Sequence, residues 1–237
     1  MNNKKLITID SSKITKGKSW DNAWPAVSYM SPATESVPYG GVNMCANAGS
    51  CATICLGNNS GRMVMPKNKA ARVNRTLRYL NDRENFLFDY GREIDAHVRR
   101  CKRKGYAPAF RPNGATDRRD LGLWVVEYCK KNHPGARVYD YTKIPPKKID
   151  GYHLVYSYSE RPEALPTALK YLREGGTVAV CFAVKRHGAL PETWNGYPVI
   201  DGDKSDARFL DTPGVVVGLR IKGSFKKAAN NPFVVLT

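Results

Sequence analysis

The sequence lacks any long hydrophobic run, and it is poor in acidic residues and in histidine. No apolar stretch approaches the ~18 residues that a membrane-spanning helix needs. The amino-terminal MNNKKLITIDSSK has basic residues but no apolar segment after them, so it does not resemble a signal peptide. Together these absences predict a cytoplasmic protein that does not enter a membrane.

Several familiar catalytic motifs are also missing. The chain has no Walker A loop, no GxGxxG after a strand, no serine nucleophile elbow and no HExxH helix. A structural zinc site is disfavoured as well, because there is no C-x2-C pair and no histidine before His97. Nucleotide hydrolysis and zinc chemistry by these common routes therefore have no support in the sequence.

Basic residues greatly outnumber acidic ones: 38 Lys and Arg against 21 Asp and Glu, a formal net charge of +17. A surplus of this size favours a polyanionic partner, most simply nucleic acid, because binding to phosphates releases condensed counterions. The candidate nucleic-acid-binding residues are Arg99, Arg100, Arg103 and Lys104. The alternative is a solvated helix face that serves only solubility.

The length of 237 residues suits one α/β domain. Residues 1–39 are rich in Ser, Pro and Lys and show little periodicity, which predicts an irregular amino-terminal arm before a domain at 40–237. The segment YGGVNMC reads as a short strand that leads into the cysteine-rich stretch. Residues 67–104 have the three- and four-residue spacing of apolar side chains that indicates helices, and two helices separated near Asn81 are the simplest interpretation.

Beyond Gly105, short strand-like runs alternate with helices. The runs are YAPAFRPNGATD, ARVYDYTK, YHLVYSYSE, TVAVCFAV, YPVIDGDKSD and VVVGLRIKG, and the helices are DLGLWVVEYCKKNHPG and PEALPTALKYLREGG. Strand–helix–strand repeats favour parallel pairing. Some connections, such as TKIPPKKIDG, cannot hold a full helix. We therefore expect an incomplete or distorted (β/α) barrel of mainly parallel strands.

Polar residues collect where these strands end, and parallel α/β folds place ligands at that edge. The candidates are Arg111, Asn113, Asp117, Asp140, Tyr141, Lys143, Ser157, Ser159, Glu160, Asp201, Asp203, Asp206 and Arg208. We expect Asp140, Asp201 and Arg111 to share one cleft. For any single residue of this set, a turn or a helix cap is the alternative.

Three of the six cysteines lie close together in the stretch NMCANAGSCATICLG. Cys45, Cys51 and Cys55 have the spacing C-x5-C-x3-C, and thiolates on one short loop can converge on a soft metal centre. Three thiolates would leave one position of an iron–sulfur cluster open. The alternative is that they are small buried residues without a metal. We expect their sulfurs to meet at the mouth of the same cleft, and Cys101, Cys129 and Cys181 to be ordinary core thiols.

Two resemblances follow from these motifs. Over about residues 40–235 the chain resembles a family of phage and plasmid proteins named for a phage gene product. The segments that carry this resemblance are CANAGSCATICLG, the basic helix after it, RPNGATD, VYDYTK, YSYSE, VAVCF, VIDGDKSDARFLD and VVVGLRIKG. The order of elements is also similar to the partial barrel of radical S-adenosylmethionine enzymes: a strand, a three-cysteine loop, a helix and then strands with polar ends. In those enzymes the three cysteines usually have the spacing C-x3-C-x2-C.

The second resemblance implies specific roles. The three cysteines would hold an iron–sulfur cluster, and Arg111, Asn113 and Asp117 would lie where those enzymes contact S-adenosylmethionine. Tyr141, Ser157 and Asp201 would line the opposite side of the cleft. With three further residues from the strand ends, the candidate catalytic set is Asp140, Tyr141, Lys143, Ser157, Asp201 and Asp203.

Three functions remain open from the sequence. The first is an iron–sulfur enzyme of radical type that acts on nucleic acid or a nucleotide-derived substrate. The second is a nuclease or phosphodiesterase in which Asp140, Asp201, Asp203 and Asp206 bind Mg²⁺ or Mn²⁺. The third is a non-catalytic protein that binds nucleic acid or inhibits a host enzyme.

Overall fold

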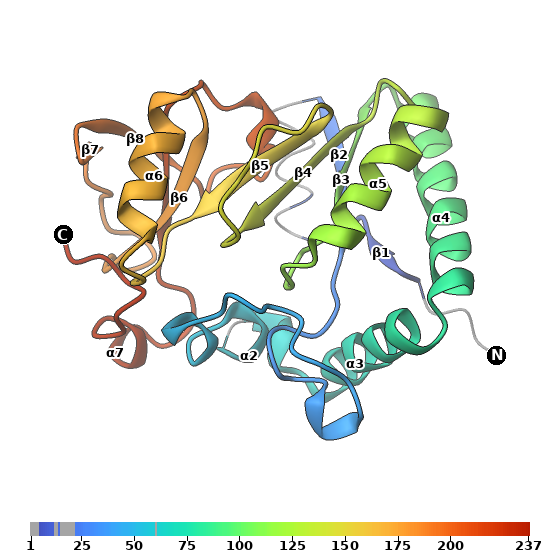
Figure 1. The fold of residues 1–237 in the computed structure, drawn as a ribbon, viewed down its shortest axis with the longest axis horizontal. Helices are drawn as coiled ribbons and strands as arrows, with labels where there is room; N and C mark the ends of the chain where they lie inside the picture. Colours follow the sequence, from blue (N-terminus) through green and yellow to red (C-terminus); the bar gives the residue numbers. More distant parts are fainter. Residues whose placement is uncertain (1–4, 12–13, 15–21, 60) are drawn as a thin grey trace.

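A nine-stranded, mostly parallel sheet organises the chain (Figure 1). The structure is a computed structural model that describes residues 5–11, 14, 22–59 and 61–237. The strand order is β1-β2-β3-β4-β5-β6-β9-β8-β7. The strands are β1 (Ile7–Thr8), β2 (Ala23–Ser28), β3 (Ala107–Arg111), β4 (Arg137–Thr142), β5 (Tyr152–Ser157), β6 (Thr177–Phe182), β7 (Thr193–Trp194), β8 (Tyr197–Asp201) and β9 (Val216–Arg220).

The strands from β2 to β6 pair in parallel and in sequence order. β9 then pairs in parallel with both β6 and β8, while the short outer strands β1 and β7 are antiparallel to their neighbours. Within the described residues no pairing joins β1 to β7, so the sheet is open at both edges. The prediction of a single α/β domain with mainly parallel strands is confirmed.

The main helices are α3 (Pro66–Asn81), α4 (Arg83–Lys104), α5 (Arg119–Asn132) and α6 (Ala164–Arg173). α4, α5 and α6 pack on one face of this sheet, whereas α3 packs against α4 and the chain after β2. Buried side chains of α4 and α5, among them Tyr90 and Val125, form one core with Leu154 of β5. α6 packs on Tyr156, which is on the same face of β5, and on Val178 and Val180 of β6. The predicted break near Asn81 is confirmed, since α3 ends there.

The opposite face of the sheet is partly covered by the chain between β8 and β9. Arg208–Leu210 forms a short 3-10 helix there, and the ring of Phe209 packs edge-on against Tyr139 of β4. Buried Asp206 accepts a hydrogen bond from the Tyr139 hydroxyl at 3.1 Å. No helix among the described residues has the length and apolar character required to cross a membrane.

Two expectations about the start of the chain differ from the structure. Residues 1–39 were expected to form an irregular arm, but they contain β1 and the fully buried strand β2. β2 escaped detection because Pro25 interrupts a run that has no polar–apolar alternation, as a strand covered on both faces has none. The segment YGGVNMC forms no strand. The strand that precedes residues 45–55, the loop that carries Cys45, Cys51 and Cys55 and is called the cysteine loop below, is β2. Residues 1–4, 12–13 and 15–21 of the expected arm lie outside the described residues.

A buried ion pair joins the segments on either side of the cysteine loop. Arg72 of α3 makes two hydrogen bonds to Glu35, of 2.6 and 3.0 Å, and both side chains are 2% exposed. The same guanidinium donates to the carbonyl oxygens of Met63 at 2.8 Å and Gly57 at 3.2 Å. One side chain therefore fixes the chain before the loop and the chain after it.

We predict that Arg72→Met destabilises the protein by about 3–5 kcal/mol, because Glu35 would be left buried without its partner. Urea unfolding followed by circular dichroism measures this. Arg78→Met is the control, since Arg78 pairs with Asp89 nearer the surface and its loss should cost about 1 kcal/mol or less. Equal costs for the two variants would show that the buried pair does not hold this region together.

Candidate functional site

A cavity of about 260 Å³ lies at the carboxyl ends of the central strands, beneath the cysteine loop. Its walls come from that loop, from the turns after β3 and β4, from β5, β6 and β9, and from the chain after β9. Figure 1 shows α2 (Leu56–Asn59) and α7 (Phe225–Ala228) beside this edge of the sheet. The predicted site residues that line the cavity are Cys45, Cys51, Cys55, Arg111, Asn113, Asp117, Tyr141, Lys143, Ser157 and Asp203.

The cysteine loop is shaped by polar contacts from elsewhere in the chain. The main-chain N–H of Ser50 donates to Glu160 at 2.7 Å, and the side-chain amide of Asn47 donates to the Lys143 carbonyl at 3.4 Å. Asn231 donates to the Ser50 carbonyl at 3.1 Å. A Cβ atom on Gly49 would stand 2.2 Å from the Glu160 carboxylate, so a larger residue here would push that carboxylate away from the Ser50 N–H. The loop thus takes its form from the strand ends.

The three loop thiols are half-buried and face the same cavity. Burial raises the pKa of Cys45 to about 11 and also raises the pKa of Cys55. Both groups are therefore neutral thiols at pH 7 in the protein alone. Among the described residues, no three His, Cys, Asp or Glu side chains are arranged as a finished metal site. The sulfurs of the three loop cysteines were expected to converge on one centre, and the described residues show no such arrangement.

The polar side chains of the turn after β3 bond to one another and to the end of β4. The Asn113 side-chain amide donates to Asp140 at 2.9 Å, and its oxygen accepts from Thr116 and from the Arg118 N–H. Asp117 accepts from the Thr142 hydroxyl and the Lys143 N–H, both at 2.8 Å. Asn113 and Asp117 therefore shape the cavity wall, and their hydrogen-bonding groups are already occupied.

Asp140 and Asp201 were expected to share the cleft with Arg111, but neither lines the cavity. Asp140 alternates with Tyr139 and Tyr141 along β4, so its carboxylate points to the helix-covered face. There it accepts hydrogen bonds from Asn113 and from the Tyr152 hydroxyl at 2.7 Å. Asp201 instead pairs with Arg220 at 2.8 Å. The prediction of one cleft for all three residues is therefore wrong.

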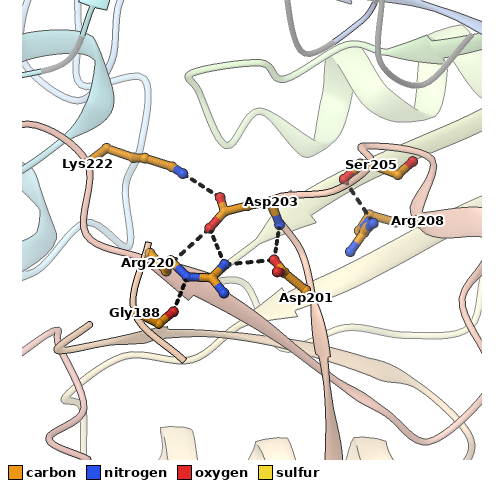
Figure 2. A network of polar contacts seen from close by, with 7 residues as sticks. All are labelled: Gly188, Asp201, Asp203, Ser205, Arg208, Arg220 and Lys222. Carbon is orange, nitrogen blue, oxygen red and sulfur yellow. Dashed lines mark hydrogen bonds and ion pairs between the residues drawn. The ribbon is translucent and has the colours of Figure 1, made fainter. Parts of the chain in front are cut away.

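Asp203 belongs to a polar network at one side of the cavity (Figure 2). Arg220 contacts both Asp201 and Asp203, at 2.8 and 3.1 Å, and donates to the Gly188 carbonyl at 2.9 Å. Lys222 also pairs with Asp203. Two cations thus face two carboxylates, and the network ties the turn after β8 to β9.

Arg111 is likewise paired. Its guanidinium lies 3.2 Å from the Asp206 carboxylate and stacks over the ring of Tyr141, 4.5 Å from the centroid. Together with the network in Figure 2, this pairing engages three of the four acidic residues that the nuclease hypothesis requires. The fourth, Asp140, points to the other face of the sheet. The four carboxylates do not converge on one point.

The basic residues Arg99, Arg100, Arg103 and Lys104 lie at the carboxyl-terminal end of α4. Because α4 ends at Lys104 and β3 begins at Ala107, this end of the helix is at the amino-terminal edge of the sheet. The cavity is at the opposite edge. Within the described part of the chain, no carboxylate forms an ion pair with these four side chains.

Sequence reasoning missed several residues of the cavity wall, among them Cys181, Phe233 and Arg220. Cys181 was expected to be a core thiol, yet it is half-buried and lines the cavity, and burial raises its pKa to about 11. Alternation along TVAVCF places it on the same face as Ala179 and could have predicted this. Phe233 and Arg220 reach the cavity through long-range folding that no local motif signals.

The chain was compared with known families and proteins. A sequence model described as gene product 88 matches residues 1–235. The chain belongs to the gene product 88 family. Its expected resemblance to a family named for a phage gene product is confirmed, over a longer range than residues 40–235. Comparisons with curated proteins and with solved structures found no match. The family description states no activity, so an argument about function depends on the site.

We predict that the free energy of unfolding depends on pH because of the buried Asp140. Burial raises its pKa to about 7, against ~3.9 for an exposed aspartate. The folded protein thus holds a proton that the unfolded chain has released, and the free energy of unfolding should fall as pH rises through that interval. Urea unfolding at about pH 5 and pH 8 should show wild type losing stability relative to Asp140→Asn, which cannot titrate. A difference that is the same at both pH values would contradict the assignment.

Proposed function

We propose that this protein is an iron–sulfur enzyme in which Cys45, Cys51 and Cys55 hold a cluster at the mouth of the strand-end cavity. The observation that carries the proposal is that these three thiols, which share one short loop, all line the same cavity. Thiolates are the ligands that iron–sulfur clusters use. Three protein ligands would leave one iron without a cysteine, and such a cluster would supply single electrons to a molecule bound in the cavity.

The chemistry of the loop fits this group. Cys45 and Cys55 are neutral thiols in the protein alone, so cluster binding would release their protons, and cluster affinity should rise with pH. Neutral thiols are also poor nucleophiles, which argues against cysteine catalysis without a metal. The contacts of Glu160 and Asn231 fix the loop backbone. The loop that carries the three cysteines is thus held in place at the cavity.

The resemblance to radical S-adenosylmethionine enzymes that the sequence motifs indicate suggests that compound as the molecule at the open iron. Asn113 and Asp117 already hydrogen-bond to β4 and to Lys143, so main-chain groups of the turn, which also lines the cavity at Gly114 and Ala115, would contact it. Tyr141 and Ser157 lie on neighbouring strands of the cavity wall and are suited to bind the substrate. The proposal requires that this open sheet corresponds to the incomplete barrel of those enzymes.

The geometry favours this function over a metal-dependent nuclease. A two-metal or one-metal phosphodiesterase needs carboxylates directed at one point. Here Asp201 and Asp203 face Arg220, and Asp206 faces Arg111. Each carboxylate already has a cationic partner, which weakens its use as a ligand of Mg²⁺ or Mn²⁺.

We predict that protein prepared without oxygen is brown and contains iron and acid-labile sulfide, and that each of Cys45→Ala, Cys51→Ala and Cys55→Ala loses both. Cys129→Ala is the matched control, because Cys129 is buried on α5 away from the cavity. It should keep the cluster and lose only about 1–3 kcal/mol of stability. Wild-type protein without iron after anaerobic reconstitution, or full iron in all three loop variants, would overturn the proposal.

We also propose that the substrate is nucleic acid or derived from it, as the net charge of +17 suggests. The exposed basic end of α4 would hold a polymer at a distance from the cavity, since the two lie at opposite edges of the sheet. A non-catalytic role in binding nucleic acid would use the same surface without the cluster.

We predict that Arg103→Gln with Lys104→Gln weakens binding to DNA or RNA of any sequence, and that wild-type affinity falls steeply with added salt. Fluorescence anisotropy at low ionic strength measures both effects. Lys170→Gln with Arg173→Gln, on exposed positions of α6, removes the same charge as a control. Absence of binding to any nucleic acid at low salt, or equal losses in the two variants, would reject this surface.

A further inference from the structure

Lys143 places a positive charge at one side of the cavity. It directly follows β4, and its main-chain N–H donates to the Asp117 carboxylate at 2.8 Å. Its carbonyl oxygen accepts a hydrogen bond from Asn47 of the cysteine loop at 3.4 Å. Both main-chain polar groups of Lys143 are thus bonded, so the fold determines where its side chain meets the cavity.

The ammonium group of Lys143 has no ion-pair partner among the described residues. The other described cations that line the cavity, Arg111, Arg220 and Lys222, each face a carboxylate. Asp117 bonds to the main chain of Lys143 and makes no ion pair with its ammonium. Because a partly buried charge without a counterion is costly, this position is suited to a negative group that enters the cavity from solvent.

A second hydrogen-bond donor lies beside this ammonium. Lys143 Nζ donates to the hydroxyl oxygen of Ser157, on β5, at 3.3 Å, and both side chains line the cavity. An ammonium group has three N–H donors and no acceptor, so the serine hydroxyl must direct its own proton elsewhere. Two adjacent donors, one of them charged, form the kind of group that binds an anionic oxygen most strongly.

Apolar side chains form much of the remaining wall. The ring centroid of Phe233 lies 4.7 Å from Lys143 Nζ, and Ile54, Leu219 and Ile221 also line the cavity. Cavities that bind small molecules commonly combine apolar walls with a few polar groups, and have volumes of about 300–1,000 Å³. At about 260 Å³, this cavity is suited to a ligand at the small end of that range.

We infer that the cavity binds a small organic anion, whose carboxylate or phosphate group lies on the Lys143 ammonium and the Ser157 hydroxyl and whose uncharged part contacts the apolar wall. This inference concerns the same cavity as the proposed function and names the charged group of the molecule that the cavity accepts. It does not require a cluster, because neither of the two groups that hold the anion is a cysteine.

The test uses the full chain without added iron and measures affinity by ligand-observed NMR titration. The probes are phenyl phosphate, benzoate and uncharged benzamide, which share one ring and differ in charge. At least one of the two anions should bind about tenfold more tightly than benzamide, or better, since hydrogen bonds to charged groups are the stronger ones. The anion that binds more tightly identifies phosphate or carboxylate as the ligand group. Lys143→Met should abolish the preference for the anion, and Lys143→Arg should retain it.

Lys222→Met is the matched control, because it removes the same charge from the same cavity, but Lys222 is already paired with Asp203. It should keep the preference for the anion. Neither anion binding more tightly than benzamide, or equal losses in Lys143→Met and Lys222→Met, would overturn the inference. Thermal unfolding shows whether each variant folds. If Lys143→Met does not fold, Ser157→Ala decides: weaker anion binding supports the inference and unchanged binding overturns it. Iron content is measured separately, so the anion site and the cluster can fail independently.

Discussion

The parallel pairing of β2 to β6 in sequence order is the constraint on which the rest of this structure depends. Because each strand lies beside the next one along the chain, the segments that follow β2, β3, β4 and β5 all emerge at one edge of the sheet. The cysteine loop, the turn at Asn113, Lys143 and Glu160 meet there for that reason. The cavity is a direct product of strand order.

The cysteine loop has little regular secondary structure of its own. It contains only short 3-10 turns, and its shape comes from Glu160, Asn231 and the carbonyl of Lys143. The buried pair of Arg72 and Glu35 holds the chain on both sides of the loop. The loop is therefore held in place by groups that lie outside it.

Sequence patterns predicted the periodic part of this fold well. Both helices of residues 67–104, α5, α6 and the strands β3 to β6, β8 and β9 follow from local apolar spacing. β2 did not, because a strand buried on both faces lacks alternation and Pro25 argued against it. Sequence patterns likewise predicted some of the residues that line the cavity and misplaced others. Strand ends indicated Tyr141, Lys143 and Ser157, but adjacency alone could not say that Asp140, one residue before Tyr141, points to the other face.

The central claim is that three thiolates of one loop bind iron at the cavity, and X-ray absorption at the iron edge of the anaerobically reconstituted protein tests it most directly. The account predicts a first shell dominated by sulfur, with iron neighbours beyond it, as in a cluster held by cysteine. A first shell of oxygen and nitrogen without iron neighbours would mean that iron binds elsewhere on the protein, and would contradict the account.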